Sequence, residues 1–226
     1  MSMIRNLLDA ISSNLISGNA YYLILKSAFV TVIITGIAWL ISFLLGGLLS
    51  YFMCYRKRLL SGLTGGICFF LRSAPVPLLI LFFYYVLWKK AHSGSVLIAG
   101  GALGCWGAGH FAEIISHSIR NAQRRQDEAV TARLGHLFYS IAFPQAIEES
   151  WFSIKRLTIH LLQWTVTAGY IGVNDLSNVM ERIGQRTSYP FFSIFFSLLF
   201  YLFLTVLIEI VFRLLAKHFS PGEVEG

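Results

Sequence analysis

The sequence predicts an all-α integral membrane protein with about five transmembrane helices. Of its 226 residues, 56% are hydrophobic and only 13% are charged, whereas soluble domains carry roughly 25% charged residues. Two long stretches, 27–55 and 187–208, contain no Asp, Glu, Lys, Arg or His. Because a helix rises about 1.5 Å per residue, about 20 apolar residues are enough to cross the hydrocarbon core. Each stretch is therefore long enough to span a bilayer.

Three further spans are expected at 62–88, 93–119 and 157–173. The first of these contains Arg72, Pro75 and Pro77. Proline lacks the amide proton that a helix interior needs, so this helix is expected either to start or to break near Pro75. The span at 93–119 is rich in glycine, and the span at 157–173 is short and holds polar residues.

The flanking segments complete the expected organisation. Residues 1–24 have apolar residues at helical spacing, from Ile4 to Leu15, with polar residues between them. They lack the unbroken apolar core and small-residue cleavage site of a signal peptide, so an external, interfacial amphipathic segment is predicted. Residues 25–219 form the transmembrane domain, and 220–226 form a cytoplasmic tail.

The distribution of Lys and Arg predicts the orientation, because these residues are retained on the cytoplasmic side. Five spans place the chain ends on opposite faces, and a cytoplasmic carboxyl end gives eleven basic residues inside against six outside. The amino terminus is therefore expected outside and the carboxyl terminus in the cytoplasm. The six outer residues are Arg5, Lys26, Lys89, Lys90, Arg182 and Arg186.

Catalytic and cofactor-binding motifs are absent from the sequence. There is no glycine-rich nucleotide loop, and no serine or cysteine nucleophile motif stands beside a base. The six histidines and three cysteines have neither metal-ligand spacing nor a disulfide framework. The net charge is +7, but a nucleic-acid-binding surface needs basic residues gathered on one face of a soluble domain, and the sequence indicates no such domain. We therefore expect no enzyme, no metal and no nucleic-acid partner, and any energy must come from an ion gradient or a partner.

Small residues recur every four positions in two of the spans. They are Ser42, Gly46 and Ser50 in the first span, and Gly100, Gly104 and Ala108 in the third. Small residues at this spacing let two helices approach closely in lipid. The pattern indicates either packing within one subunit or a helix interface that slides between two states.

Two charged residues fall within expected spans. Arg72 is costly in a bilayer, so we expect it to snorkel to the interface, to pair, or to face water. Glu113 lies toward the cytoplasmic end of the third span, and one interpretation is that it pairs with a basic residue. The other interpretation is that Arg72, Pro75 and Glu113 line or gate a translocation path.

A polar, basic island interrupts the apolar chain at about 120–156. Within it, Glu128-Ala129-Val130 precedes Gly135, and Ile141-Ala142-Phe143-Pro144-Gln145 follows. The island resembles the EAA loop of ABC-importer permeases, whose pattern is E-A-A, three residues, G, and later I-x-L-P. In that family the loop forms a short cytoplasmic helix that docks on the ATPase subunit. The resemblance implies that Glu128, Ala129, Gly135, Ile141, Pro144 and Gln145 couple this chain to an ATPase.

Four other segments resemble permeases of the polar-amino-acid uptake group, which includes histidine, glutamine and arginine permeases. They are residues 70–75, 112–114, 169–176 and 186–191, in the family's order. The resemblance extends over about 26–217. It departs at the loop, where Glu128 to Gly135 is one residue longer and Gly135 to Pro144 is nine steps rather than thirteen. The net loss of three residues is about one helical turn and predicts a shorter or differently pitched docking helix.

The resemblance implies the transmembrane domain of a type I ABC importer with a cytoplasmic coupling loop. The implied function is that of a permease subunit in an ATP-driven amino-acid uptake system, forming half of the translocation path in a bacterial cytoplasmic membrane. ATP and Mg would be bound by two partner ATPase subunits. A second permease copy or paralogue and an extracytoplasmic substrate-binding protein are the other implied partners.

Two alternatives remain at the level of sequence. A non-transporting or divergent paralogue that acts as a membrane scaffold would account for the shortened loop and the packing glycines. An ion-driven secondary transporter would have inverted repeats and ionisable residues near the midplane, and the sequence has neither a repeat nor a convincing relay.

Overall fold

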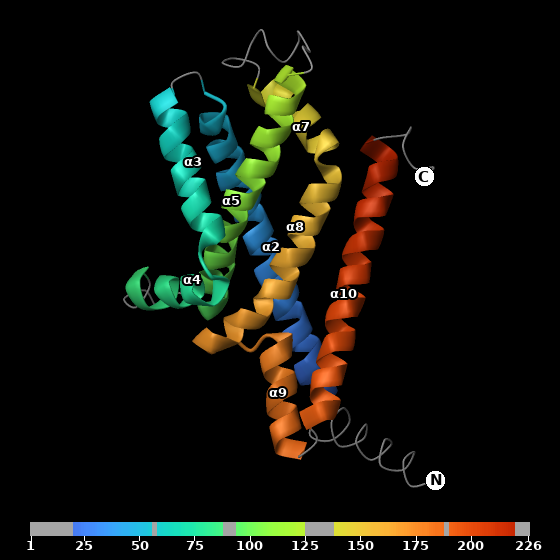
Figure 1. Ribbon diagram of the computed structural model, residues 1–226. Coiled ribbons are helices and arrows are strands. Elements are labelled where there is room, and N and C mark those ends of the chain that lie inside the picture. The colour runs from blue at the N-terminus through green and yellow to red at the C-terminus, as the bar shows by residue number, and fades with distance from the viewer. Residues whose placement is uncertain (1–19, 56–57, 88–93, 125–137, 188–189, 220–226) are drawn as a thin grey trace.

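The computed structural model describes residues 20–55, 58–87, 94–124, 138–187 and 190–219, which form a bundle of helices without strands (Figure 1). The principal helices are α2 (Ala20–Met53), α3 (Arg58–Ser73), α5 (Ser95–Arg124), α8 (Trp151–Trp164) and α10 (Pro190–Phe219). The shorter elements are α4 (Val76–Phe82), η3 (Phe83–Leu87), η4 (Phe138–Ala142), α7 (Phe143–Glu149), η5 (Thr165–Ile171) and α9 (Leu176–Thr187). Successive principal helices run in alternating directions, so α2 begins and α10 ends at opposite ends of the bundle (Figure 1).

Three helices in the described part of the chain are long and apolar enough to cross a membrane. They are Ala20–Met53, Ser95–Ala122 and Ser193–Ala216, and they correspond to the first, third and fifth expected spans. Their length and apolar composition confirm a helical integral membrane protein.

The second expected span is a bent pair of helices, Arg58–Ser73 and Val76–Val86, with an angle of 103° between them. Pro75 lies at the bend with φ −60° and ψ 122°, and α4 has proline in its first turn. The first turn of a helix tolerates proline because its amides have no intrahelical partner. The expected break near Pro75 is confirmed.

The fourth expected span has different boundaries from those predicted. Its α-helix, α8, begins at Trp151 and ends at Trp164, whereas the sequence predicted 157–173. The chain continues as the 3₁₀-helix η5. This helix is terminated by Gly172, which has a left-handed φ of 76°. At about 1.5 Å per residue, the 14 residues of α8 are shorter than the hydrocarbon core of about 30 Å.

The small residues of α2 and α5 bring these two helices into close contact. A Cβ atom on Gly104 would lie 2.6 Å from Cβ of Ile41, and one on Gly46 would lie 2.9 Å from the carbonyl oxygen of Ala108. The Ser42 hydroxyl donates to the carbonyl oxygen of Gly104 at 3.1 Å. These contacts confirm the interpretation that the two small-residue patterns pack helices of one subunit together.

A buried polar network around Asp175 connects α9 to α2 and α10. Oδ2 of Asp175 accepts a hydrogen bond from the Ser177 amide at 3.1 Å, so the carboxylate caps the start of α9. The Tyr201 hydroxyl donates to the same oxygen at 3.3 Å, and the amide that follows Asp175 donates to Oγ1 of Thr31 at 3.1 Å. Burial, partly offset by these hydrogen bonds, raises the pKa of Asp175 to about 6.

Candidate functional site

The predicted coupling residues fall on both sides of a boundary of the described chain. Glu128, Ala129 and Gly135 lie in 125–137, outside the described residues. Ile141 lies in η4, and Pro144 and Gln145 lie in α7. These two elements stand at the end of the bundle where α5 ends and α8 begins (Figure 1).

The sequence of α7 gives this short helix one buried face and one exposed face. Pro144 lies in its first turn, where a fixed φ suits the helix. Phe143 and Ala146 are buried, whereas Pro144, Gln145 and Glu148 are exposed. The motif residues Pro144 and Gln145 are therefore available to a partner.

Aromatic packing anchors the buried face of α7 to the bundle. The Phe143 ring lies 5.8 Å from that of Phe43 in α2, 6.0 Å from that of Phe138 and 5.7 Å from that of Tyr139, measured between centroids. A Cβ on Gly47 would come within 3.3 Å of the Phe143 ring. Such tilted and edge-to-face pairs are worth about 0.5–1.5 kcal/mol each beyond the area they bury. Phe143 therefore packs α7 directly against α2.

Polar contacts connect the end of α7 to α5, and α5 to the end of α2. The Ser118 hydroxyl of α5 donates to the Glu149 carboxylate of α7 at 2.5 Å. This bond borders a polar cavity of about 380 Å³ between α5, α7 and α8, which Glu113 and His117 also line. The Arg120 guanidinium donates to the carbonyl oxygen of Met53 at 3.2 Å, at the end of α2.

An ion pair connects α8 to α10 in the same half of the bundle. Nζ of Lys155 lies 2.6 Å from Oε1 of Glu209. The Lys155 ammonium also lies 5.4 Å from the centroid of the Phe152 ring. The pair holds α10 against α8, which α7 directly precedes.

The three candidate path residues lie together where α3 meets α5. Arg72 and Glu113 form an ion pair, which confirms that Glu113 pairs with a basic residue. The side chains are 31% and 43% exposed, so both retain access to the surroundings. Pro75 follows three residues after Arg72 at the bend into α4. A Cβ on Gly109 would come within 2.9 Å of the Cys68 carbonyl oxygen, so α3 and α5 touch closely beside the pair.

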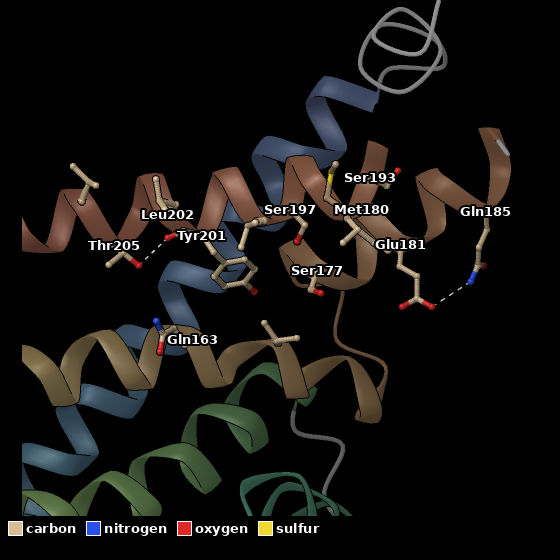
Figure 2. A pocket seen from close by; sticks show the side chains of 14 residues that line it. Gln163, Ser177, Met180, Glu181, Gln185, Ser193, Ser197, Tyr201, Leu202 and Thr205 are labelled. Atoms are coloured by element: carbon tan, nitrogen blue, oxygen red, sulfur yellow. Dashed lines mark hydrogen bonds between the residues drawn. The ribbon is translucent and has the colours of Figure 1, made fainter. Parts of the chain in front are cut away.

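Sequence reasoning missed a larger cavity, of about 910 Å³, between α8, α9 and α10 (Figure 2). Its polar side chains recur every four residues on two helices: Ser177, Glu181 and Gln185 on α9, and Ser193, Ser197, Tyr201 and Thr205 on α10. Gln163 of α8 completes the set, and Gln185 donates to Oε1 of Glu181 at 3.3 Å. The signal that would have found it is the four-residue recurrence of hydroxyls within the otherwise apolar run 187–208.

Metal binding has no support from the geometry of the described part of the chain. Within those ranges, no three His, Cys, Asp or Glu side chains lie close enough together to hold a metal ion.

A bundle of membrane-spanning helices with a bent second span and a short, exposed helix anchored at one end is the architecture of a multi-pass membrane protein. The chain belongs to the family of binding-protein-dependent transport system inner membrane components, whose model matches residues 42–223. No curated protein is similar enough in sequence to count as a match. Membership identifies a multi-pass permease component of an ABC transporter that is not itself catalytic.

Two solved structures show the same fold at low sequence identity. One is a crystal structure of an amino acid ABC transporter with histidines: it has a TM-score of 0.75 and 19% identity, and the match covers 88% of this chain and 94% of that chain. The other is an inward-facing structure of the MetNI methionine ABC transporter, with a TM-score of 0.73 and 16% identity over 91% of this chain and 100% of that chain. The type I importer fold expected from the sequence is confirmed.

Proposed function

We propose that this chain is the permease subunit of an ATP-driven amino-acid uptake system and forms half of the translocation path. The observation that carries the proposal is the construction of α7. Its buried Phe143 packs on α2, while Pro144 and Gln145 are exposed at the end of the bundle. This arrangement suits an element that a partner protein contacts and whose movement shifts the spanning helices.

The proposed partners supply what this chain lacks. Two ATPase subunits bind ATP and Mg and dock on the α7 end, through Ile141, Pro144 and Gln145 together with Glu128, Ala129 and Gly135. A second permease copy or paralogue forms the other half of the path, and an extracytoplasmic substrate-binding protein delivers the solute. The α7 end is cytoplasmic in this proposal, and the start of α2 lies outside.

The intramembrane polar groups have distinct roles in the proposed path. The α8–α9–α10 cavity offers hydroxyl and amide groups to a polar solute, because intramembrane polar side chains commonly line such routes. The Arg72–Glu113 pair, beside the bend at Pro75, acts as a gate whose two charges remain neutralised while it is closed. Separation of α3 from α5 would open this pair.

The experiment is reconstitution of the tagged chain, with its co-expressed ATPase and binding protein, into liposomes. We expect solute to stimulate ATP hydrolysis and to accumulate inside. In Phe143→Ala the ATPase should still co-purify, but stimulation of hydrolysis should fall severalfold because the contact between α7 and α2 is lost. Phe195→Ala, at an exposed position of α10, is the matched control and should retain stimulation.

Each contrary outcome points to a different function. If no ATPase co-purifies, the importer assignment fails and an ion-driven transporter becomes the better explanation. If the ATPase co-purifies but no solute stimulates hydrolysis, the chain is a scaffold or an inactive paralogue. Equal activity of both phenylalanine variants would contradict the proposed role of α7.

A further inference from the structure

A basic cavity of about 480 Å³ opens at the end of the bundle opposite α7. The start of α2 and helix α9 lie at this end (Figure 1). The described residues that line the cavity come from α2, the first turn of α5, the turn after η5, and α9. Three of them have cationic side chains, Lys26, Arg182 and Arg186, and none of these described lining residues is Asp or Glu.

The described carboxylates on and beside α9 do not line the basic cavity. Arg182 and Arg186 are four residues apart and line the basic cavity. Glu181 lines the α8–α9–α10 cavity instead, where it accepts a hydrogen bond from Gln185. Asp175 is fully buried and is directed at the α9 amides and Tyr201. Lys26 and Arg182 thus place two cationic groups in the basic cavity, whereas Glu181 and Asp175 do not line it.

The placement of these cations runs against the usual distribution of charge. In the proposed orientation this end faces outside, where Lys and Arg are normally depleted. Three of the six outer basic residues nevertheless meet in one cavity. Because opposite charges attract, an anion bound between Lys26 and Arg182 would be stabilised by both side chains.

The remaining walls of the cavity suit an organic anion of small size. Leu23, Val30 and Val173 provide apolar surface, and Asn174 adds an exposed amide. Ser95 contributes from the first turn of the 30-residue helix α5, whose dipole favours negative charge at its amino end. A volume of about 480 Å³ lies within the range of roughly 300–1,000 Å³ for small-molecule sites.

We propose that this basic cavity binds the carboxylate of a small organic solute at the outer face and disfavours solutes with net positive charge. Lys26 and Arg182 hold the carboxylate, and the apolar walls accept the carbon skeleton. The statement that the bound solute is the transported one rests on the proposed function; binding itself does not.

Equilibrium binding to the full-length chain tests the proposal. The chain is purified with any accompanying subunits and placed in phosphatidylcholine nanodiscs. The probes are radiolabelled L-glutamate, L-glutamine and L-arginine, with their α-amides and inorganic phosphate as unlabelled competitors. The variants are Lys26→Gln and Arg182→Gln, and Glu181→Gln on the other face of α9 is the matched control. Elution volume and far-UV circular dichroism confirm that each variant is folded.

We expect L-glutamate to bind tightest and L-arginine weakest, and the α-amides to compete poorly. Each loss of a cation should weaken L-glutamate binding about tenfold, as expected for a charge-assisted hydrogen bond, and Glu181→Gln should leave it within about twofold. The affinity should fall as the salt concentration rises.

Several results would overturn the proposal. The proposal is wrong if no carboxylate probe binds, if the α-amides compete as well as the free acids, or if both cation variants bind L-glutamate with unchanged affinity. Displacement of L-glutamate by phosphate, or by phosphatidylglycerol in the nanodisc, would identify a lipid-headgroup site instead. The assay needs no ATPase. If the chain co-purifies with an ATPase but binds no carboxylate probe, only this inference is refuted. If it binds the probe but no ATPase co-purifies, only the proposed function is refuted.

Discussion

The close approach of α2 and α5 makes Gly104 a site where one methyl group should have a large effect. In Gly104→Ala the new Cβ would lie 2.6 Å from Cβ of Ile41, about 0.9 Å inside a normal carbon–carbon contact of about 3.5 Å. Overpacking of this kind costs about 1–3 kcal/mol. Separating the helices by the same distance would also stretch the 3.1 Å bond from Ser42 to the Gly104 carbonyl oxygen, which is worth about 0.6 kcal/mol between membrane helices. Relative to the same Gly→Ala change at an uncrowded position of the helix, we therefore expect a loss of about 2–4 kcal/mol in the free energy of unfolding.

Gly101→Ala is the matched control, because a Cβ on Gly101 meets nothing within 4 Å. It lies on the same helix three residues away, and replacing a helical glycine with alanine is neutral or stabilises by up to about 1 kcal/mol. The assay is reversible unfolding in mixed detergent micelles, followed by far-UV circular dichroism. Equal stability of the two variants would show that α2 and α5 are not packed as closely as described.

Three further perturbations address the opposite end of the bundle and the α8–α10 contact. Because the pKa of Asp175 is raised from 3.8 to about 6, the folded state binds more protons than the unfolded state between these values, and stability should fall by up to about 3 kcal/mol as pH rises from about 4 to 6. Asp175→Asn, which keeps a helix-capping side chain, should abolish that dependence in pH-resolved unfolding, and a persisting slope would assign it to another group. Gly172→Ala should lower the free energy of unfolding by about 1–2 kcal/mol, because Gly172 has a left-handed φ of 76° that alanine disfavours, although no atom lies within 4 Å of the new Cβ. An unchanged melting temperature would argue against this conformation. Lys155→Glu should lower thermal stability and Glu209→Lys in the same chain should restore it, whereas a double variant no better than the single one would mean that the ion pair does not connect α8 to α10.

Local sequence features were sufficient to predict much of the fold. Charge-free stretches identified the first and fifth spans because lipid excludes charge over a fixed thickness. Pro75 located the break in the second span, since proline removes a backbone donor whatever surrounds it. The small-residue spacing of Gly104 and its neighbours identified helix faces that pack closely, and the structure shows that these faces of α2 and α5 pack on each other.

Features that depend on tertiary contacts were not predictable in the same way. The partner of Glu113 is Arg72, 41 positions earlier in the chain, and no local pattern encodes that pairing. The anchoring of Phe143 against Phe43 is equally long-range, so the motif was recognised from the sequence, but the role of Phe143 in holding it against α2 was not. The boundaries of α8 were misplaced because its 14 residues pack among neighbouring helices and need no full apolar span.

Site-specific photo-cross-linking tests the central claim most directly, namely that the α7 end receives the ATPase. A photoreactive residue is placed at Gln145, exposed on α7, and in a second preparation at Gln185, exposed on α9 at the other end of the bundle. The account predicts that Gln145 forms a cross-link to the ATPase subunit in membranes and that Gln185 forms none. Cross-links to the ATPase from Gln185 and none from Gln145 would contradict both the orientation and the proposed role of α7.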